Sequence, residues 1–491
     1  MGRVSLKEYW TFKSFISSST KFFFSYHDEN VTCRWYFLAF LISLTPLLPD
    51  IVTNANAVVI IPLAIIFLVK DIIYGNGIVQ NAKKSGVGTS LGQMKENCLY
   101  LDYNATTPIY PEVAEAMKPY LFGSCFGNPS SSHPYGQGCR EGLDRARRRV
   151  AALVGARPAE IYFTSCGSES DHWAVESGIK AGALARGLQG QKPHAVACNV
   201  EHYAVFKCLD RLQARGEIDV TYVPVDARGL AAPAAVAAAV TGRTALVTVM
   251  HAQNEVGALQ DVKAIASKVH RIDPRILVHT DAAQSVGKVP VKADQLGVDL
   301  LTLAGHKFGA PKGVAALYCR QGVDLEPVIL GAKQEFGKRA GTENVALAVA
   351  LGMAAQLADA ELPRAQRHMA ALRDRLERAL VAGLPPGLVR VHGPTEAHQR
   401  LPNTLSVGFR GVKAPELKAA LDPVVACSAG AACGGAGNAV ALSPTLAAMG
   451  VPEEYGLGTL RLSLGRHSTE DEIDRAAKYI INAVKKLVSV P

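Results

Sequence analysis

A lysine and an aspartate each follow a short apolar run of the kind that predicts a buried β-strand. Asp281 comes directly after Ile276-Leu-Val-His-Thr280, and Lys307 follows Leu300-Leu-Thr-Leu-Ala-Gly-His306. An aldehyde cofactor of the pyridoxal type needs an amine for a Schiff base and a carboxylate to keep its ring nitrogen protonated. Neighbouring strands would bring Lys307 and Asp281 together for this purpose. An exposed lysine and a helix N-cap aspartate are an equally good interpretation of the spacing alone.

A run of small residues follows an earlier candidate strand and offers a place for a phosphate. Ser165-Cys-Gly-Ser168-Glu-Ser170 stands at the start of a predicted helix, where backbone N–H groups and a hydroxyl can reach an anion. Ser and Gly at a helix start are also ordinary capping residues, so the signal is weak. His202 has the flat ring needed to stack on a heterocycle, although a single histidine is more often structural.

A third feature is a cysteine in a segment of very small residues. Cys433 lies within Cys427-Ser-Ala-Gly-Ala-Ala-Cys-Gly-Gly-Ala-Gly437, which has the composition of a flexible loop. A thiol on such a loop can act as a nucleophile because its pKa of about 8.5 lies near neutrality. Burial in a core is the commoner fate of a free cysteine, and Cys427 fits that interpretation. For Cys433 we favour the nucleophile.

These residues need a scaffold, and the periodicity from residue 98 onward predicts one of the α/β class. Short apolar runs alternate with segments that repeat apolar residues every three or four positions, as at 140–154 and 262–269. Strands separated by helices indicate a mostly parallel sheet covered on both faces, with ligands beyond the carboxyl ends of the strands. The predicted strands are residues 160–164, 194–198, 220–223, 244–250, 276–279 and 300–304.

The pattern changes after about residue 360. A charged helix at 363–381 precedes strand-like runs at 388–391 and 404–409, and a last helix covers 470–488. We therefore expect a large domain at 98–360, of which 98–115 can pack with the other domain. A smaller α+β domain at 361–491 would carry the Cys433 loop.

The first 97 residues form a predicted N-terminal extension. Residues 1–27 combine Lys, Arg and Ser with few acids, which is compatible with an organelle transit peptide. Apolar runs follow at 35–48 and 51–69, and a helix over the second would be about 28 Å long, close to a bilayer core. We expect apolar helices that form a membrane tether at 35–69, with a poorly ordered extension as the alternative.

Composition excludes several classes of protein. Of the 491 residues 48% are hydrophobic and 19% are charged, which is too apolar for a disordered chain. The net charge of +9 is spread thinly and forms no basic block, so we expect no nucleic-acid partner. Ten cysteines show neither a disulfide framework nor the spacing of a metal site, and we predict no metal. Reduced thiols favour an intracellular compartment, either the cytosol or an organelle matrix.

Together these segments resemble the class V pyridoxal-phosphate enzymes of the cysteine desulfurase and selenocysteine lyase family. Nine motifs occur in the family's order between Tyr100 and about residue 485, and nine in order are far more specific than any one of them. They are LDYNATTP (101–108), GNPSSSH (127–133), HAQNEVG (251–257), VHTDAAQ (278–284), GHK (305–307), RAGTEN (339–344), SAGAAC (428–433), SPTLAAMG (443–450) and LRLSLGR (460–466).

The resemblance implies the type I fold of pyridoxal-phosphate enzymes and a homodimer. It implies an activity that removes sulfur or selenium from L-cysteine or L-selenocysteine and leaves L-alanine, with pyridoxal 5'-phosphate as cofactor. Lys307 would form the Schiff base and move protons, and Asp281 would pair with the ring nitrogen. Cys433 would attack the sulfur or selenium atom and pass it to an acceptor protein.

The resemblance assigns the remaining site residues in the same way. Arg461 would clamp the substrate carboxylate through two parallel hydrogen bonds, beside Asn254, which would contact both substrate and cofactor. The other cofactor contacts would be Gln284 with the phenolic oxygen, His202 stacked on the ring, Ser168 and His306 with the phosphate, and Thr342 reaching in from a second subunit.

The chain departs from the family pattern at several positions. Ser168 stands where Thr is usual and keeps the hydroxyl, whereas Ala304 lacks the hydroxyl that many desulfurases have there. Asp171-His172 replaces a usual Asn pair, and Gly434 follows the cysteine where His or Thr is common.

Four hypotheses stay open at this point. A cysteine desulfurase leads, and a selenocysteine lyase is nearly indistinguishable from it by sequence. An aminotransferase of the same fold would explain Lys307 and Asp281 but gives no role to Cys433. A membrane-tethered scaffold with a degenerate site is disfavoured because Lys307, Asp281, His202, Arg461 and Cys433 are all present.

Overall fold

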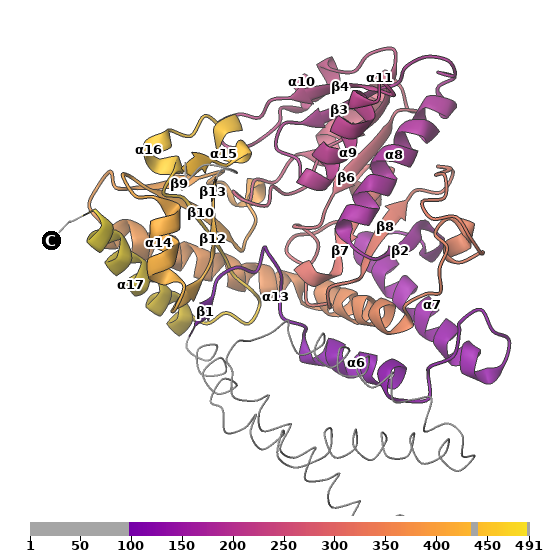
Figure 1. Ribbon diagram of the computed structural model, residues 1–491, viewed down its shortest axis with the longest axis horizontal. Coiled ribbons are helices and arrows are strands. Elements are labelled where there is room, and N and C mark those ends of the chain that lie inside the picture. Colours follow the sequence, from indigo (N-terminus) through magenta and orange to yellow (C-terminus); the bar gives the residue numbers. More distant parts are fainter. Residues whose placement is uncertain (1–97, 434–439, 489–491) are drawn as a thin grey trace, which may run out of the picture. The chain divides into compact units, whose positions relative to one another are not determined.

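The computed structural model describes residues 98–433 and 440–488 (Figure 1). These described residues all belong to one compact unit. The predicted extension at 1–97, with its apolar helices and the tether at 35–69, lies outside the described residues.

A seven-stranded sheet forms the larger part of the fold. Its order is β2-β8-β7-β6-β5-β3-β4, in which the five strands from β7 to β4 are parallel and β8 is antiparallel to both neighbours. The strands are β2 (Ile161–Thr164), β3 (His194–Cys198), β4 (Asp219–Val223), β5 (Thr244–Thr248), β6 (Leu277–Asp281), β7 (Leu300–Ala304) and β8 (Ala315–Cys319). The prediction of a mostly parallel sheet is confirmed. The sequence analysis misses β8, because β8 follows β7 without the helix that separates the other strands.

Helices cover both faces of this sheet (Figure 1). Successive residues of a strand point to opposite faces, so each strand contributes to two apolar clusters. Helices α8 (Gly167–Ala185) and α9 (Tyr203–Ala214) share one cluster with Leu246 and Leu300. On the other face α7 (Pro134–Val154), α11 (Val262–Ile272) and the first half of α13 (Val345–Gly383) pack with Val247 and Leu301. Shorter helices on this part of the chain are α6 (Pro111–Leu121), α10 (Pro233–Ala238) and α12 (Ala293–Leu296).

A second sheet has its own apolar cluster. Its order is β12-β15-β10-β9, and all its neighbours are antiparallel. Leu372, Leu376 and Leu380 from the second half of α13 pack beneath it, together with α14 (Ala414–Leu421) and α17 (Glu470–Leu487). The strands are β9 (Val389–His392), β10 (Thr404–Phe409), β12 (Ser428–Ala429) and β15 (Leu460–Ser463).

Short elements complete this second part. Strand β1 (Leu99–Tyr100) pairs in parallel with β11 (Val425–Ala426), and Leu99 belongs to the same apolar cluster. Strands β13 (Ala431–Cys433) and β14 (Val440–Leu442) form an antiparallel pair, followed by α15 (Pro444–Ala448) and α16 (Glu453–Gly456).

Helix α13 is longer than the sequence predicts. It starts at Val345 instead of residue 363, and Pro363 lies within its 39 residues. A proline removes one backbone hydrogen bond, and the buried residues on both sides of it supply packing that a local pattern does not reveal. Residue 360, our predicted domain boundary, therefore lies inside this helix. Among the described residues, α13 is a helix long and apolar enough to cross a membrane by length and composition. Its packing against α6, α7 and α17 is that of a core helix.

Candidate active site

The candidate residues gather beyond the carboxyl ends of the parallel strands. Asp281 is the last residue of β6, and Lys307 ends the single turn η3 (Gly305–Lys307) directly after β7. Asn254 follows β5, and His202 follows β3 as the N-cap of α9. Parallel strands present their carboxyl ends at one edge of the sheet, so residues distant in sequence meet there.

Lys307 is largely buried and is held by backbone carbonyls. Its Nζ donates to the carbonyl oxygens of Asn104 at 2.6 Å and Ala105 at 3.0 Å. Burial lowers the pKa of Lys307 from 10.5 to about 8, and the positive charge of Arg461 adds to the effect, while Asp281 acts in the opposite direction. A substantial fraction of this amine is therefore neutral near pH 8, which is the nucleophilic form.

Three polar side chains lie together next to Asp281. One ligand-type atom from each of Asp171, His202 and Asp281 lies within 4.8 Å of the other two. Asp281 is 5% exposed and accepts a hydrogen bond from the Ala283 N–H at 2.8 Å. Burial raises the pKa of Asp281, whereas His202 and Lys307 lower it. The position of His202 beside Asp281 agrees with a ring that covers a heterocycle held by that carboxylate.

Asp171, for which the sequence analysis gives no role, lies behind Asp281 on α8. Its pKa is raised well above the usual value, first by burial and then by the negative charge of Asp281. Its Oδ1 is 3.8 Å from His279 Nε2 and has no hydrogen-bond partner within the described part of the chain. His279 is itself held by the hydroxyls of Thr248 at 2.9 Å and Thr302 at 3.2 Å. Burial and the proximity of Asp281 thus favour the neutral form of the Asp171 carboxyl.

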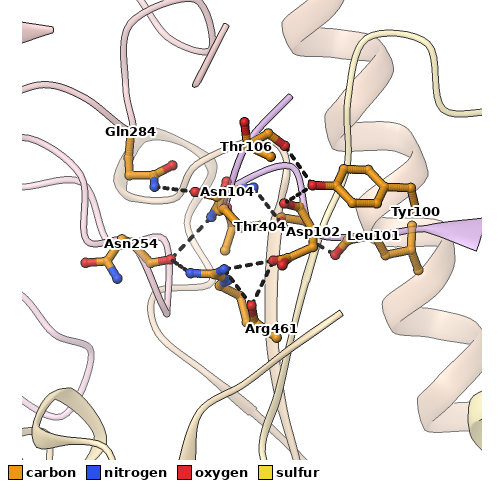
Figure 2. Close-up of polar contacts among 12 residues, drawn as sticks. Tyr100, Leu101, Asp102, Asn104, Thr106, Asn254, Gln284, Thr404 and Arg461 are labelled. Carbon is orange, nitrogen blue, oxygen red and sulfur yellow. Dashed lines mark hydrogen bonds and ion pairs between the residues drawn. The ribbon is translucent and has the colours of Figure 1, made fainter. Parts of the chain in front are cut away.

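Asn104 connects the two sheets at the site (Figure 2). Its carbonyl oxygen accepts hydrogen bonds from Lys307 Nζ and from Gln284 Nε2, the latter at 2.8 Å. Its side chain donates to Thr404 Oγ1 on β10 at 2.9 Å and accepts from Asn403 Nδ2 at 3.0 Å. The motif at 101–108 therefore supplies a contact on which Lys307 and Gln284 both depend.

Arg461 extends from β15 toward the same place (Figure 2). One terminal nitrogen donates to the Asn254 carbonyl oxygen at 3.0 Å, and the other to Asp102 Oδ1 at 2.8 Å and Ser428 Oγ at 2.9 Å. Its Nε is buried and has no partner among the residues described. Asp102 thus orients the guanidinium. A carboxylate that enters the site can accept hydrogen bonds that the guanidinium now donates to other groups of the chain.

The predicted phosphate segment opens α8. Gly167 is its first residue and Ser168 its second, and Ser168 is exposed. A Cβ on Gly167 would lie 3.4 Å from the Ala304 side chain at the end of β7, so the helix start and η3 approach closely. His306 lies in η3 with Nδ1 3.2 Å from Thr106 Oγ1, and burial lowers its pKa to about 4. Ser168 and His306 therefore flank a helix N-terminus, and His306 is neutral near pH 7.

Thr342 is exposed on the segment that precedes α13. An ion pair of 2.8 Å between Arg339 and Glu169 ties this segment to the first turn of α8. Within the described chain, Thr342 makes no side-chain hydrogen bond to the other candidate residues.

Cys433 is the last residue of β13, where its backbone pairs with Val440. Residues 428–433, expected as part of a flexible loop, instead form the short strands β12 and β13. This correction has a physical reason. Pairing of β12 with β15 and of β13 with β14 provides backbone hydrogen bonds, and small side chains without an alternating pattern give no sign of such pairing in the sequence. Cys427 is buried, as predicted, and burial raises its pKa to about 12.

Sequence reasoning misses four polar residues of the site: Asp102, Asn104, Asp171 and Lys288. Asp102 and Asn104 belong to a quoted motif, so a signal existed, but their partners lie some 300 or more positions away. Asp171 and Lys288 are buried polar residues whose sequence neighbours do not reveal their surroundings.

Comparison with known proteins gives a consistent result. Residues 99–476 match the family model described as aminotransferase class-V. The chain is 40% identical over 390 residues to the cysteine desulfurase of Trichormus azollae, covering 79% of this chain and 93% of that one. It is 39% identical over 412 residues to the cysteine desulfurase IscS of Methanosarcina thermophila, covering 83% and 96%.

The fold has a solved counterpart as well. A structure titled NifS-like protein superposes with a TM-score of 0.71 at 34% identity and covers 80% of this chain and 100% of that one. This similarity confirms the predicted type I fold of pyridoxal-phosphate enzymes for the described residues. The chain is an enzyme that belongs to the aminotransferase class-V family, among the cysteine desulfurase-like members.

Proposed function

We propose that this enzyme is a pyridoxal-phosphate-dependent cysteine desulfurase, which removes sulfur from L-cysteine and leaves L-alanine. The observation that carries the proposal is the position of the Lys307 amine, buried with a pKa of about 8 and in electrostatic contact with Asp281 and Arg461. An amine of this kind, between a buried carboxylate and an oriented guanidinium, suits a site for an aldehyde cofactor and an amino-acid substrate.

The donor set of the site fits pyridoxal 5'-phosphate. Lys307 would hold its aldehyde carbon and Asp281 its ring nitrogen, with His202 over the ring. The cofactor, when bound, supplies an electron sink for the pair released at the substrate. The other residues that we assign to it are Ser168 and His306 for the phosphate, Gln284 for the ring oxygen, and Asn254 beside it.

Arg461 is the residue that we assign to the substrate carboxylate. Its ion pair with Asp102 fixes the guanidinium plane before substrate arrives. Two parallel N–H···O bonds from a pre-oriented Arg are stronger than neutral hydrogen bonds and select an α-carboxylate. Asn254 adds a carbonyl contact that keeps Arg461 at the strand edge.

The sulfur transfer is assigned to Cys433 and Lys307. The Cys433 thiolate forms an S–S bond with the substrate sulfur while the substrate C–S bond breaks, and the electron pair stays on the carbon side. Lys307, which titrates near neutral pH, delivers the proton that completes alanine. Cysteine and the Cys433 thiol thus become alanine and a persulfide on Cys433, with no outside oxidant. An acceptor protein would then take this sulfur.

A homodimer is part of the proposal because Thr342 would serve the site of a second subunit. Thr342 is exposed, and large apolar side chains are exposed on segments near α6 and before Thr342. These side chains are Leu121, Phe122, Phe126, Leu330 and Phe336, with exposed fractions between 52% and 88%. Large exposed apolar groups of this kind are typical of protein interfaces.

The organisation of the chain remains a prediction in three respects. The separate apolar clusters under the two sheets support a large domain at 98–360 and a small one at 361–491. The sparse cysteines of the sequence, without a disulfide framework, are the basis for proposing a reducing intracellular compartment, cytosol or organelle matrix. A membrane tether at 35–69 stays a hypothesis.

The experiment that tests the function measures products from two substrates. Purified protein is incubated with L-cysteine and with L-selenocysteine, and alanine, sulfide, selenide and pyruvate are quantified. We expect alanine from cysteine, and we expect Lys307→Ala to abolish it and Cys433→Ser to lower it by at least about 100-fold, as expected for loss of a nucleophile.

The alternatives give different product patterns. A selenocysteine lyase would use selenocysteine much faster and would keep that activity in Cys433→Ser, because a selenol leaves more readily than a thiol. An aminotransferase would give pyruvate without sulfide. A degenerate scaffold would show no visible absorption band from a bound cofactor.

A further inference from the structure

Lys288 is a second buried lysine next to the catalytic one, and the proposed mechanism gives it no task. It lies in the turn after β6, four residues beyond Gln284, and is 4% exposed. Its Nζ donates to Gln284 Oε1 at 2.8 Å and to Asn104 Oδ1 at 3.1 Å. Within residues 98–433 and 440–488 it forms no ion pair.

The surroundings of Lys288 disfavour a full positive charge. Burial lowers its pKa well below the usual value, and the charges of Lys307 and Arg461 act in the same direction. A neutral amine has two N–H groups, and Lys288 has two acceptors within reach. Both N–H groups of the neutral form therefore have a hydrogen-bond partner. Lys288 also lines a small cavity. The other charged or titratable side chains that line it belong to Tyr103, Tyr110, Lys307, Glu361 and Arg466.

The contact with Gln284 decides which way the Gln284 amide faces. Because Lys288 donates to Oε1, the amide nitrogen lies at the other end, where it donates to the Asn104 carbonyl oxygen at 2.8 Å. An amide nitrogen has two hydrogens, and this contact uses one. The second hydrogen remains for another acceptor. With the amide reversed, Gln284 Oε1 would face the Asn104 carbonyl oxygen, two acceptors would oppose each other, and the hydrogen bond from Lys288 to Oε1 would be lost.

We propose that Lys288 is a positioning residue of the active site: its amine fixes the Gln284 amide so that Nε2 presents a free hydrogen to the ring oxygen of the cofactor. The inference deepens the proposed function and rests on the assignment of Gln284 to that oxygen. Lys288 also donates to Asn104 Oδ1, and the backbone carbonyl oxygen of Asn104 accepts the other hydrogen bond of the same Gln284 amide.

The expected effect is a change in acidity. A donor to the ring oxygen weakens the hold of that oxygen on the proton it shares with the Lys307 nitrogen. Loss of the oriented donor therefore raises the pH at which the visible spectrum of the bound cofactor changes. We expect Lys288→Met to raise this midpoint by about half to one pH unit, the free energy of one hydrogen bond expressed as a pKa shift.

The test uses the full-length holoenzyme and a double-mutant cycle. Spectral midpoints and cofactor dissociation constants are measured for the wild type, Lys288→Met, Gln284→Leu and the double variant. If Lys288 acts through Gln284, the double variant has the midpoint of Gln284→Leu alone. Lys292→Met is the matched control, because Lys292 donates to Ala152 O and Asp359 Oδ1, away from the site, and its midpoint should equal that of the wild type.

The outcomes separate the two proposals. An unchanged midpoint in Lys288→Met, or additive shifts in the double variant, would overturn the role of Lys288. No shift in Gln284→Leu would instead refute the assignment of Gln284, and a wild type without a visible band would refute the proposed function. If Lys288→Met does not fold, Lys288→Gln replaces it. That polar side chain is one atom too short to reach Gln284 Oε1, so it should raise the midpoint too.

Discussion

At the scale of the residue, burial and the nearby positive charge of Arg461 lower the pKa of the Lys307 amine to about 8. The neutral amine is the form that attacks an aldehyde, and its fraction rises as pH increases through the pKa of about 8. We expect cofactor capture by the apoprotein to accelerate about tenfold per pH unit below 8 and to level off above about pH 9. Stopped-flow absorbance between pH 6 and 10 measures this rate.

Two variants check the cause of that pH dependence. Lys307→Ala should show no visible band at any pH. Arg461→Leu removes the nearby positive charge that helps to lower the pKa of Lys307, so the midpoint of capture should move upward. A wild-type midpoint near the ordinary lysine value of 10.5 would mean that the amine is solvated in the apoprotein.

At the scale of the element, the close contact of α8 with the sheet decides where the phosphate segment lies. A Cβ on Gly182 would clash with the Ala245 carbonyl oxygen on β5. We expect Gly182→Ala to lower the free energy of unfolding by about 1–3 kcal/mol, because the helix must move off the strand. It should also weaken cofactor binding, since the same helix begins at Gly167 and Ser168. Thermal unfolding and cofactor titration measure both effects.

Gly138→Ala on α7 is the matched control, because its Cβ would meet Cys125 Sγ at an ordinary contact distance of 3.7 Å. Removing an unneeded glycine from a helix should raise stability by roughly 0.4–1 kcal/mol. Equal changes in the free energy of unfolding for the two substitutions would show that helix propensity, and not the contact with β5, determines the effect of Gly182→Ala.

At the scale of the whole molecule, the segment before α6 joins the two sheets. Residues 99–104 supply strand β1, the Asp102 partner of Arg461 and the Asn104 contacts to Lys307 and Lys288. We expect a chain of residues 98–491 to fold and bind the cofactor as the full chain does. A chain of residues 106–491 should bind it at least about tenfold more weakly, because the Lys307 amine and the Gln284 amide lose the Asn104 carbonyl oxygen that accepts their hydrogen bonds. Equal cofactor affinity of both chains would contradict this role of the segment.

Much of the candidate site was accessible from the sequence because its side chains follow strands, and strands are visible as apolar runs. The runs before Asp281 and Lys307 predict strands within one or two residues of β6 and β7. Once those strands are parallel neighbours, the meeting of the two side chains follows from sheet geometry. The order of the nine motifs then indicated the family, which the comparisons confirm.

Local patterns failed where packing across the chain overrides them. The start of α13 at Val345, with Pro363 inside it, depends on apolar contacts to both sheets. Strand β8 pairs with the distant strand β2 as well as with β7, and the short strand β12 pairs with β15, which follows later in the chain. Their own side chains, small and without clear alternation, do not specify a strand.

The sequence by itself determined the fold class and the family and supplied the candidate site residues, since these depend on residue types, spacing and order. Only the tertiary structure decided how those residues are tuned. The lowered pKa of Lys307, the raised pKa of Asp171 beside Asp281, and the hydrogen bond from Lys288 to the Gln284 amide arise from burial and from contacts in the folded chain. Desolvation and hydrogen-bond partners depend on three-dimensional surroundings, which no local stretch of sequence contains.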